Sequence, residues 1–240
     1  MRIRKAIQHS SLAEPKTVRL TVPESYTELS DKQLEYLYEL LSLFPLDEAK
    51  AYFLLRCSQV DGNEDVSRLP SELMAVAMSH LDWVGEPPEC PVRLASMNGC
   101  KAIDSELHGC TFQKYITIEN LYQGYLLTQD SSAVDSLASV LYPGFSGNTT
   151  ASQAYNVIAW ITAVKQLFAA KWPFFFRSSG PSEHIPSMED IMNSEIRALT
   201  GGDITKESVV LNSDCWRALT ELNEKAKEAK EMERIANQHK

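Results

Sequence analysis

The chain has 240 residues, of which 44% are hydrophobic and 23% are charged, and its formal net charge at pH 7 is −9. This composition supports a packed core and excludes an intrinsically disordered chain. The negative charge disfavours nucleic acid as a partner. A basic N-terminal arm that includes Arg2, Arg4 and Lys5 keeps DNA binding as a minor alternative.

The longest stretch without a charged residue, 144–164, is half polar, so we expect no segment that crosses a membrane. No apolar export signal follows the basic N-terminus. The number of cysteines is odd, which favours free thiols in a reducing compartment and predicts a cytoplasmic protein. The cysteines are Cys57, Cys90, Cys100, Cys110 and Cys215.

Residues 1–29 have the pattern of an extended N-terminal segment, and the alternation over 18–22 predicts one short strand. Ser30 and Gln33 then form a capping-box signature, which predicts a helix ending before Pro45. A second helix is expected over 46–57, and a third from Pro70 through Val84.

Residues 89–109 have no sustained period, but the Asn98-Gly99 pair favours a tight hairpin turn. Helical spacing returns from Phe112, and Ser132 has the spacing of a helix cap. Apolar residues then recur on a broad face of 150–171, which we interpret as the central buried helix.

Further caps are expected at Ser187, for a helix ended by Gly201, and at Ser213. Residues 223–240 are rich in Lys, Glu and Ala, which predicts a projecting, solvated helix end. The expected fold is therefore mainly α: one helical domain over 1–240 around the 150–171 helix. It has at most a short β element near the N-terminus or within 90–110.

Two segments have ligand types suited to metals. Residues from Asp61 to Glu72 have the oxygen spacing of a calcium loop, but Val66 stands where the sharp turn needs glycine. Cys90, Cys100, His108 and Cys110 offer zinc ligands, but the cysteines lie ten residues apart rather than two to four. We expect no metal and no cofactor; metal binding at either segment remains the open alternative.

No pattern in the sequence indicates nucleophilic catalysis or phosphate binding, so no catalytic residue is expected. The alternative is an enzyme of unknown class whose site is assembled from distant residues. Its candidate side chains would be His80, His108, Cys110 and Glu119.

Two apolar groups could contact a partner protein. One is the cluster Trp172, Phe174, Phe175 and Phe176, which belongs to the core if buried and forms an interface anchor if exposed. The other is the first part of the last helix, through Trp216, Leu219 and Leu222.

Residues 23–34, together with 199–207 and 216–219, resemble uncharacterised prophage and mobile-element proteins of anaerobic gut bacteria. The resemblance implies a role in virion assembly or another accessory role, and it brings no catalytic residues. We therefore expect a non-enzymatic interaction or assembly factor, of the tail-assembly chaperone or adaptor type. Its expected partners are proteins, a second copy of the chain included.

Overall fold

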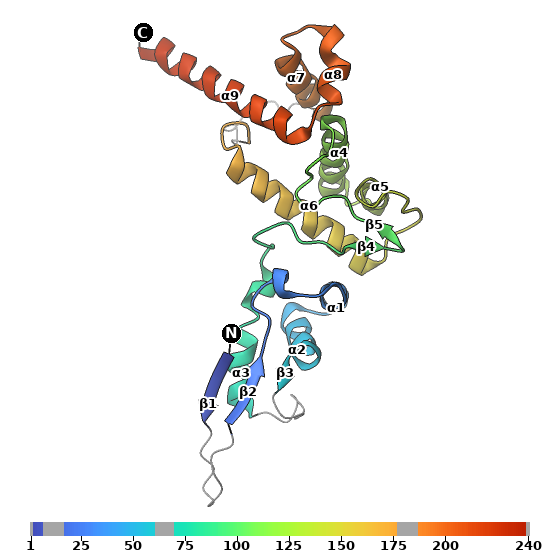
Figure 1. The fold of residues 1–240 in the computed structure, drawn as a ribbon, viewed down its shortest axis with the longest axis vertical. Helices are drawn as coiled ribbons and strands as arrows, with labels where there is room; N and C mark the ends of the chain where they lie inside the picture. The colour runs from blue at the N-terminus through green and yellow to red at the C-terminus, as the bar shows by residue number, and fades with distance from the viewer. Residues whose placement is uncertain (1, 7–16, 61–69, 177–186, 239–240) are drawn as a thin grey trace, which may run out of the picture.

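The computed structural model describes residues 2–6, 17–60, 70–176 and 187–238. The molecule is elongated and mainly α-helical, with its N-terminal strands at one end and its last helices at the other (Figure 1). The expected mainly α fold is confirmed.

The N-terminal end contains more β structure than expected. β1 (Arg2–Ala6) pairs antiparallel with β2 (Thr17–Thr21), and β2 also pairs with β3 (Gln59–Val60). The expected strand is β2. The sequence carried no clear signal for β1 or for the two-residue β3, because such short pairings depend on a partner distant in the chain.

A helical hairpin follows this sheet. In α1 (Asp31–Leu43) the capping box is present, since Gln33 N donates to Ser30 Oγ over 3.4 Å and Ser30 N donates to Gln33 Oε1 over 3.0 Å. α2 (Leu46–Cys57) packs against α1 and has the expected bounds.

The third helix is shorter than expected. α3 (Ser71–Ser79) ends well before Val84, and a 3₁₀ turn, η3 (Asp82–Gly85), follows it. Contacts with the N-terminal segment stabilise the turn: Tyr26 Oη donates to Val84 O, and Trp83 Nε1 donates to Pro23 O. An earlier 3₁₀ turn, η1 (Tyr26–Glu28), presents the Tyr26 side chain.

The predicted hairpin is present, so the chain has β structure both near the N-terminus and within 90–110. β4 (Ser96–Met97) and β5 (Cys100–Lys101) are joined through Asn98 and Gly99, whose φ angles are 50° and 81°. Both residues of a type I′ turn require positive φ, which explains the Asn-Gly pair.

The centre of the molecule is α6 (Ala151–Lys171), which packs against α1 on one side and α5 (Ser131–Leu141) on another. Thr150 and Gln153 form its capping box. Its buried face includes Trp160, Ile161 and Phe168. α4 (Phe112–Thr128) packs against α5, and its Tyr122 Oη is hydrogen bonded to Thr162 Oγ1 on α6.

Two expected helix caps lie at the wrong residue. α5 is capped by Asp130, whose carboxylate accepts from Ser132 N, and not by Ser132. α9 (Cys215–Gln238) is capped by Asp214, which accepts from Trp216 N and Arg217 N, and not by Ser213. In each case an aspartate lies within two residues of the expected serine and is itself a strong cap.

α7 (Met188–Thr200) begins at the predicted Ser187 cap and ends at Gly201, where φ is 65°. A 3₁₀ turn, η4 (Ile204–Lys206), and the short α8 (Glu207–Leu211) follow, neither of which was expected. Beyond Asn223, α9 is mostly exposed and projects from the body (Figure 1).

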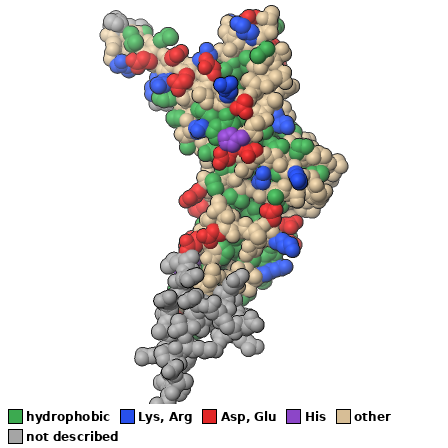
Figure 2. All heavy atoms as spheres, viewed as in Figure 1, with side chains coloured by type: hydrophobic (Ala, Val, Ile, Leu, Met, Phe, Trp, Pro, Cys, Tyr) green, Lys and Arg blue, Asp and Glu red, His purple; other side chains and the backbone are tan. Residues whose placement is uncertain are grey.

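The face in Figure 2 has acidic and basic side chains interspersed, with hydrophobic side chains between them. In the described part of the chain, none of the helices combines the length and the apolar character that a membrane crossing needs.

Candidate functional site

A cavity of about 850 Å³ lies between α4, α6, α7 and the residues that follow α6. We call it the α4–α7 cavity. Its described lining combines seven aromatic or apolar side chains with six polar or charged ones. The lining residues are Tyr115, Ile116, Glu119, Asn120, Gln123, Gly124, Leu127, Lys165, Phe175, Phe176, Glu189, Ile191, Met192 and Glu195. An apolar hollow with a few convergent polar groups is the usual form of a binding site.

One ion pair crosses the cavity from α4 to α6. Lys165 Nζ lies 2.5 Å from Glu119 Oε1, and both side chains are largely buried. Gln123 Nε2 donates to the same oxygen over 3.0 Å. Lys165 Nζ also lies 5.3 Å from the centroid of the Phe176 ring. The Glu119 and Lys165 charges are therefore matched to each other inside the protein.

The second carboxylate, Glu195 on α7, has a different environment. It forms no hydrogen bond and no ion pair with any described residue. Burial raises the pKa of Glu195 to about 7; the negative charge of Glu119 adds to this effect and Lys165 opposes it. Glu195 therefore changes charge near neutral pH, which is uncommon for a carboxyl group outside functional sites.

Asn120 gives the cavity an unpaired polar atom. Its Nδ2 lies 2.9 Å from Met192 Sδ, which is only a weak acceptor, while its Oδ1 is buried without a hydrogen-bond partner among the described residues. An unpaired buried polar atom costs free energy, so it indicates a position where a ligand can add a hydrogen bond.

The rim of the cavity is apolar. Leu127, the next-to-last residue of α4, is 85% exposed, and Ile191 on α7 is also exposed. Leu126, which precedes Leu127 in α4, is exposed too, although it does not line the cavity. Exposed apolar side chains grouped beside a cavity are typical of binding surfaces.

The residues proposed as partner contacts divide into two groups. Trp172, Leu219 and Leu222 are buried in the core, so their apolar surface is used within the chain. Phe174, Phe175, Phe176 and Trp216 are partly exposed. Phe175 and Phe176 line the α4–α7 cavity, and Lys230 Nζ lies 5.5 Å from the Phe174 ring centroid.

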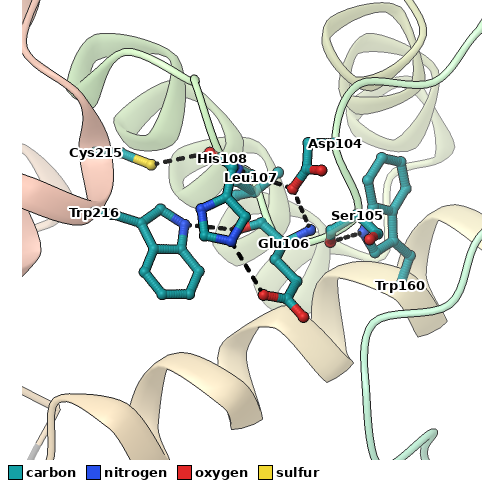
Figure 3. Close-up of polar contacts among 8 residues, drawn as sticks. All are labelled: Asp104, Ser105, Glu106, Leu107, His108, Trp160, Cys215 and Trp216. Atoms are coloured by element: carbon teal, nitrogen blue, oxygen red, sulfur yellow. Dashed lines mark hydrogen bonds and ion pairs between the residues drawn. The ribbon is translucent and has the colours of Figure 1, made fainter.

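His108 lies elsewhere, in the loop that connects β5 to α4 and packs against α6 and the start of α9. Its ring stacks on Trp216 with centroids 4.1 Å apart, and its Nε2 lies 3.3 Å from Glu106 Oε2 (Figure 3). Both side chains of the His108–Glu106 pair are substantially exposed.

The backbone of this loop is held by donors from both helices. Trp160 Nε1 donates to Ser105 O, Trp216 Nε1 to Glu106 O, and Cys215 Sγ to Leu107 O (Figure 3). These bonds fix the start of α9 to α6, which gives the loop a structural role. His108 is a surface residue of that junction.

The remaining sequence candidates do not join the cavity. His80 is the C-cap residue that follows α3, and Cys110 is buried, which raises the pKa of its thiol. Burial raises the pKa of Cys215 to about 12, so neither thiol is poised to react as a thiolate. Of the four candidates for an enzyme, only Glu119 lines the α4–α7 cavity.

The metal-like segments gain no support. Asp61 and the residues up to Leu69 lie outside the described residues, and Glu72 is exposed on α3. Within the described ranges, no group of three or more His, Cys, Asp or Glu side chains is placed to hold a metal ion, and this covers Cys90, Cys100, His108 and Cys110.

A second hollow, of about 570 Å³, lies where α6 approaches the N-terminal part and is lined by Tyr26, Pro87, Pro88, Tyr125 and Tyr155 among others. The one charged residue in its described lining, Glu86, is exposed, so this hollow has no carboxylate with a raised pKa like that of Glu195. The α4–α7 cavity is therefore the stronger candidate.

The sequence did not indicate Lys165, Asn120 or Glu195. Each is an ordinary polar residue of a different helix, and they stand at least 30 positions apart in the sequence. Only the packing of α4, α6 and α7 brings them to one cavity. Comparison with family models, curated proteins and solved structures finds no match to this chain.

Proposed function

We propose that this chain is a non-enzymatic interaction or assembly factor that binds a segment of a partner protein in the α4–α7 cavity. The observation that carries the proposal is the combination of an exposed apolar rim, at Leu127 and Ile191, with a buried polar interior. Protein interfaces have this arrangement, in which apolar anchors surround a few specific polar contacts.

The exposed surface of the chain supports the proposal. The described helices and strands form an elongated body from which α9 projects (Figure 1). An elongated body with a projecting helix offers more surface for partners than a compact enzyme of equal mass.

Within this class we propose a phage or mobile-element role, such as a tail-assembly chaperone or adaptor, on the basis of the resemblance of 23–34, 199–207 and 216–219. We also propose a cytoplasmic location. All five cysteines are free thiols, which fits a reducing compartment.

Co-expression with the proteins encoded by neighbouring genes tests the proposal. We expect one of them, encoded among tail, capsid or portal genes, to co-purify in a fixed stoichiometry. Leu127→Glu should abolish the complex because it places a charge on the apolar rim. The matched control is Ile204→Glu, since Ile204 is 80% exposed but lies outside the cavity.

The proposal is wrong if no neighbouring protein binds, or if both variants bind equally well. Neighbouring genes of metabolic type would contradict the assembly role specifically. Circular dichroism of both variants checks that each is folded.

One observation favours an enzyme as the second candidate. A carboxyl group with a pKa of about 7, as in Glu195, is suited to general acid or base catalysis at neutral pH. However, the described lining contains no Ser, Thr, Cys or His to act as a nucleophile or proton partner. Mass spectrometry of the co-purified partner separates the two functions, since only an enzyme leaves a Glu195-dependent change of mass.

A further inference from the structure

The α4–α7 cavity has an excess of negative charge. Its described lining carries three carboxylates, Glu119, Glu189 and Glu195, against the single ammonium group of Lys165, which leaves a formal charge of −2 when all are ionised. Lys165 is 2.5 Å from Glu119, so its charge is already engaged. Glu195 is a partly buried carboxylate that forms no ion pair with any described residue.

Two further features of the lining suit a cation. The buried Asn120 Oδ1 is an acceptor without a donor. The rings of Phe175 and Phe176 lie on the same cavity, and Phe176 already faces the ammonium group of Lys165. Aromatic faces attract a nearby cation through the quadrupole of the ring.

The rim limits which cation can enter. Leu127, Ile191 and the partly exposed Met192 border the polar interior with apolar surface. A free inorganic cation would gain nothing from these side chains, and its binding would leave them exposed to water. A Lys or Arg side chain presented between apolar residues would satisfy both the interior and the rim.

We propose that the α4–α7 cavity receives one lysine or arginine side chain of a partner protein, flanked by apolar residues, with Glu195 as its counter-ion and Asn120 Oδ1 as a second acceptor. This inference rests on the proposed function and names the chemistry of the partner segment. A single basic anchor among apolar residues would define both the register and the specificity of docking.

Selection from a random-peptide display library on the full-length protein at pH 8 tests the proposal. We expect the enriched peptides to share a Lys or Arg between apolar residues and to lose binding to Leu127→Glu. Replacing that basic residue by Gln in a synthetic peptide should weaken binding to the wild type about tenfold or more.

The decisive comparison uses Glu195→Gln, an isosteric neutral variant, with Glu189→Gln as the control on the same helix. Glu195→Gln should bind the Lys and Gln peptides with nearly equal affinity, whereas Glu189→Gln should keep most of the discrimination. Affinity of the wild type for the Lys peptide should rise as the pH increases through about 7, because Glu195 then becomes charged.

Enriched peptides without a cation would overturn the inference, as would equal discrimination by the wild type and Glu195→Gln. A selection that yields no peptide sensitive to Leu127→Glu would also overturn it. If the co-expressed partner still needs Leu127 but is indifferent to Glu195→Gln, only this inference fails and the proposed function stands. If no partner depends on Leu127, the proposed function fails.

Discussion

At the scale of single residues, Glu119 and Glu195, two of the three cavity glutamates, show how environment determines the chemistry of identical groups. Glu119 is buried but accepts from Lys165 and Gln123, so its charge is stabilised. Glu195 is partly buried without such partners, so its charged form is destabilised. The same cavity therefore holds one carboxylate paired with an ammonium group and one whose pKa is raised by burial.

Glu195→Gln should change how stability depends on pH. The pKa of Glu195 is about 7 in the folded chain, against 4.5 as the reference value. The folded state therefore binds the proton more tightly, and wild-type stability falls as the pH rises from about 4.5 to 7. We expect Glu195→Gln to gain on the order of 1–2 kcal/mol relative to the wild type between pH 5 and 8.

Urea unfolding of both proteins at several pH values measures this difference. Glu189→Gln serves as the control because it changes an exposed carboxylate of the same helix. A difference between wild type and Glu195→Gln that does not vary with pH would contradict the prediction.

A second residue-scale prediction concerns the buried amide of Asn156 on α6. Its Oδ1 accepts from Leu94 N over 2.9 Å, and its Nδ2 donates to Tyr142 Oη, which in turn donates to Leu94 O. Asn156→Leu leaves the Leu94 N–H buried and unpaired, so we expect a loss of about 2–4 kcal/mol in the free energy of unfolding.

Tyr142→Phe is the matched comparison for Asn156→Leu. It removes one hydroxyl from the same network but leaves the bond from Leu94 N to Asn156 intact, so the expected loss is only about 1 kcal/mol. Chemical denaturation ranks the two variants. The reverse order would show that the Asn156 bond to the backbone is not the main stabilising contact.

At the scale of elements, α9 consists of a first part that packs into the core and an outer part that is exposed. Its first turns carry Cys215, Leu219 and Leu222 into the core, and Trp216 Nε1 bonds to Glu106 O. Its outer part is exposed and is supported by pairs within the helix, such as Arg234 with Glu231. Stability therefore depends on the first part, and the outer part is available for contacts.

Ending the chain after Lys230 should leave the thermal midpoint within about 1–2 °C of the wild type, because the removed described residues are exposed. Trp216→Ala should instead lower it by many degrees, through loss of about 3 kcal/mol of packing against Trp172 and Phe168. Scanning calorimetry compares the two. A large loss on truncation would show that the outer part of α9 is held by the body.

The sequence predicted features that depend on neighbouring residues better than features that depend on contacts between distant segments. Ser30 and Ser187 cap their helices as expected, because a capping box depends only on residues three positions apart. β1 was not expected, because its strand pairing joins separate segments. The α4–α7 cavity was missed for the same reason: Glu119 was only one of several candidates, and nothing local pointed to Glu195.

At the scale of the whole molecule, α6 links two unequal ends. The N-terminal sheet and α2 and α3 lie toward one end, and α7, α8 and α9 lie toward the other (Figure 1). The α4–α7 cavity belongs to the second end, close to the projecting helix. A partner held in the cavity would therefore lie near α9, so the two surfaces could act on one partner.

This shape leads to a prediction for the protein in solution. A compact chain of 240 residues has an expected radius of gyration of about 18 Å. Because the described body is elongated and α9 extends from it, we expect small-angle X-ray scattering of the monomer to give more than about 20 Å. Light scattering on the same sample must establish the mass, since a dimer would raise the radius for a different reason.

A monomer with a radius near 18 Å would mean that α9 folds back onto the body. In that case the outer part of α9 would be covered within the chain and could not share a partner with the α4–α7 cavity.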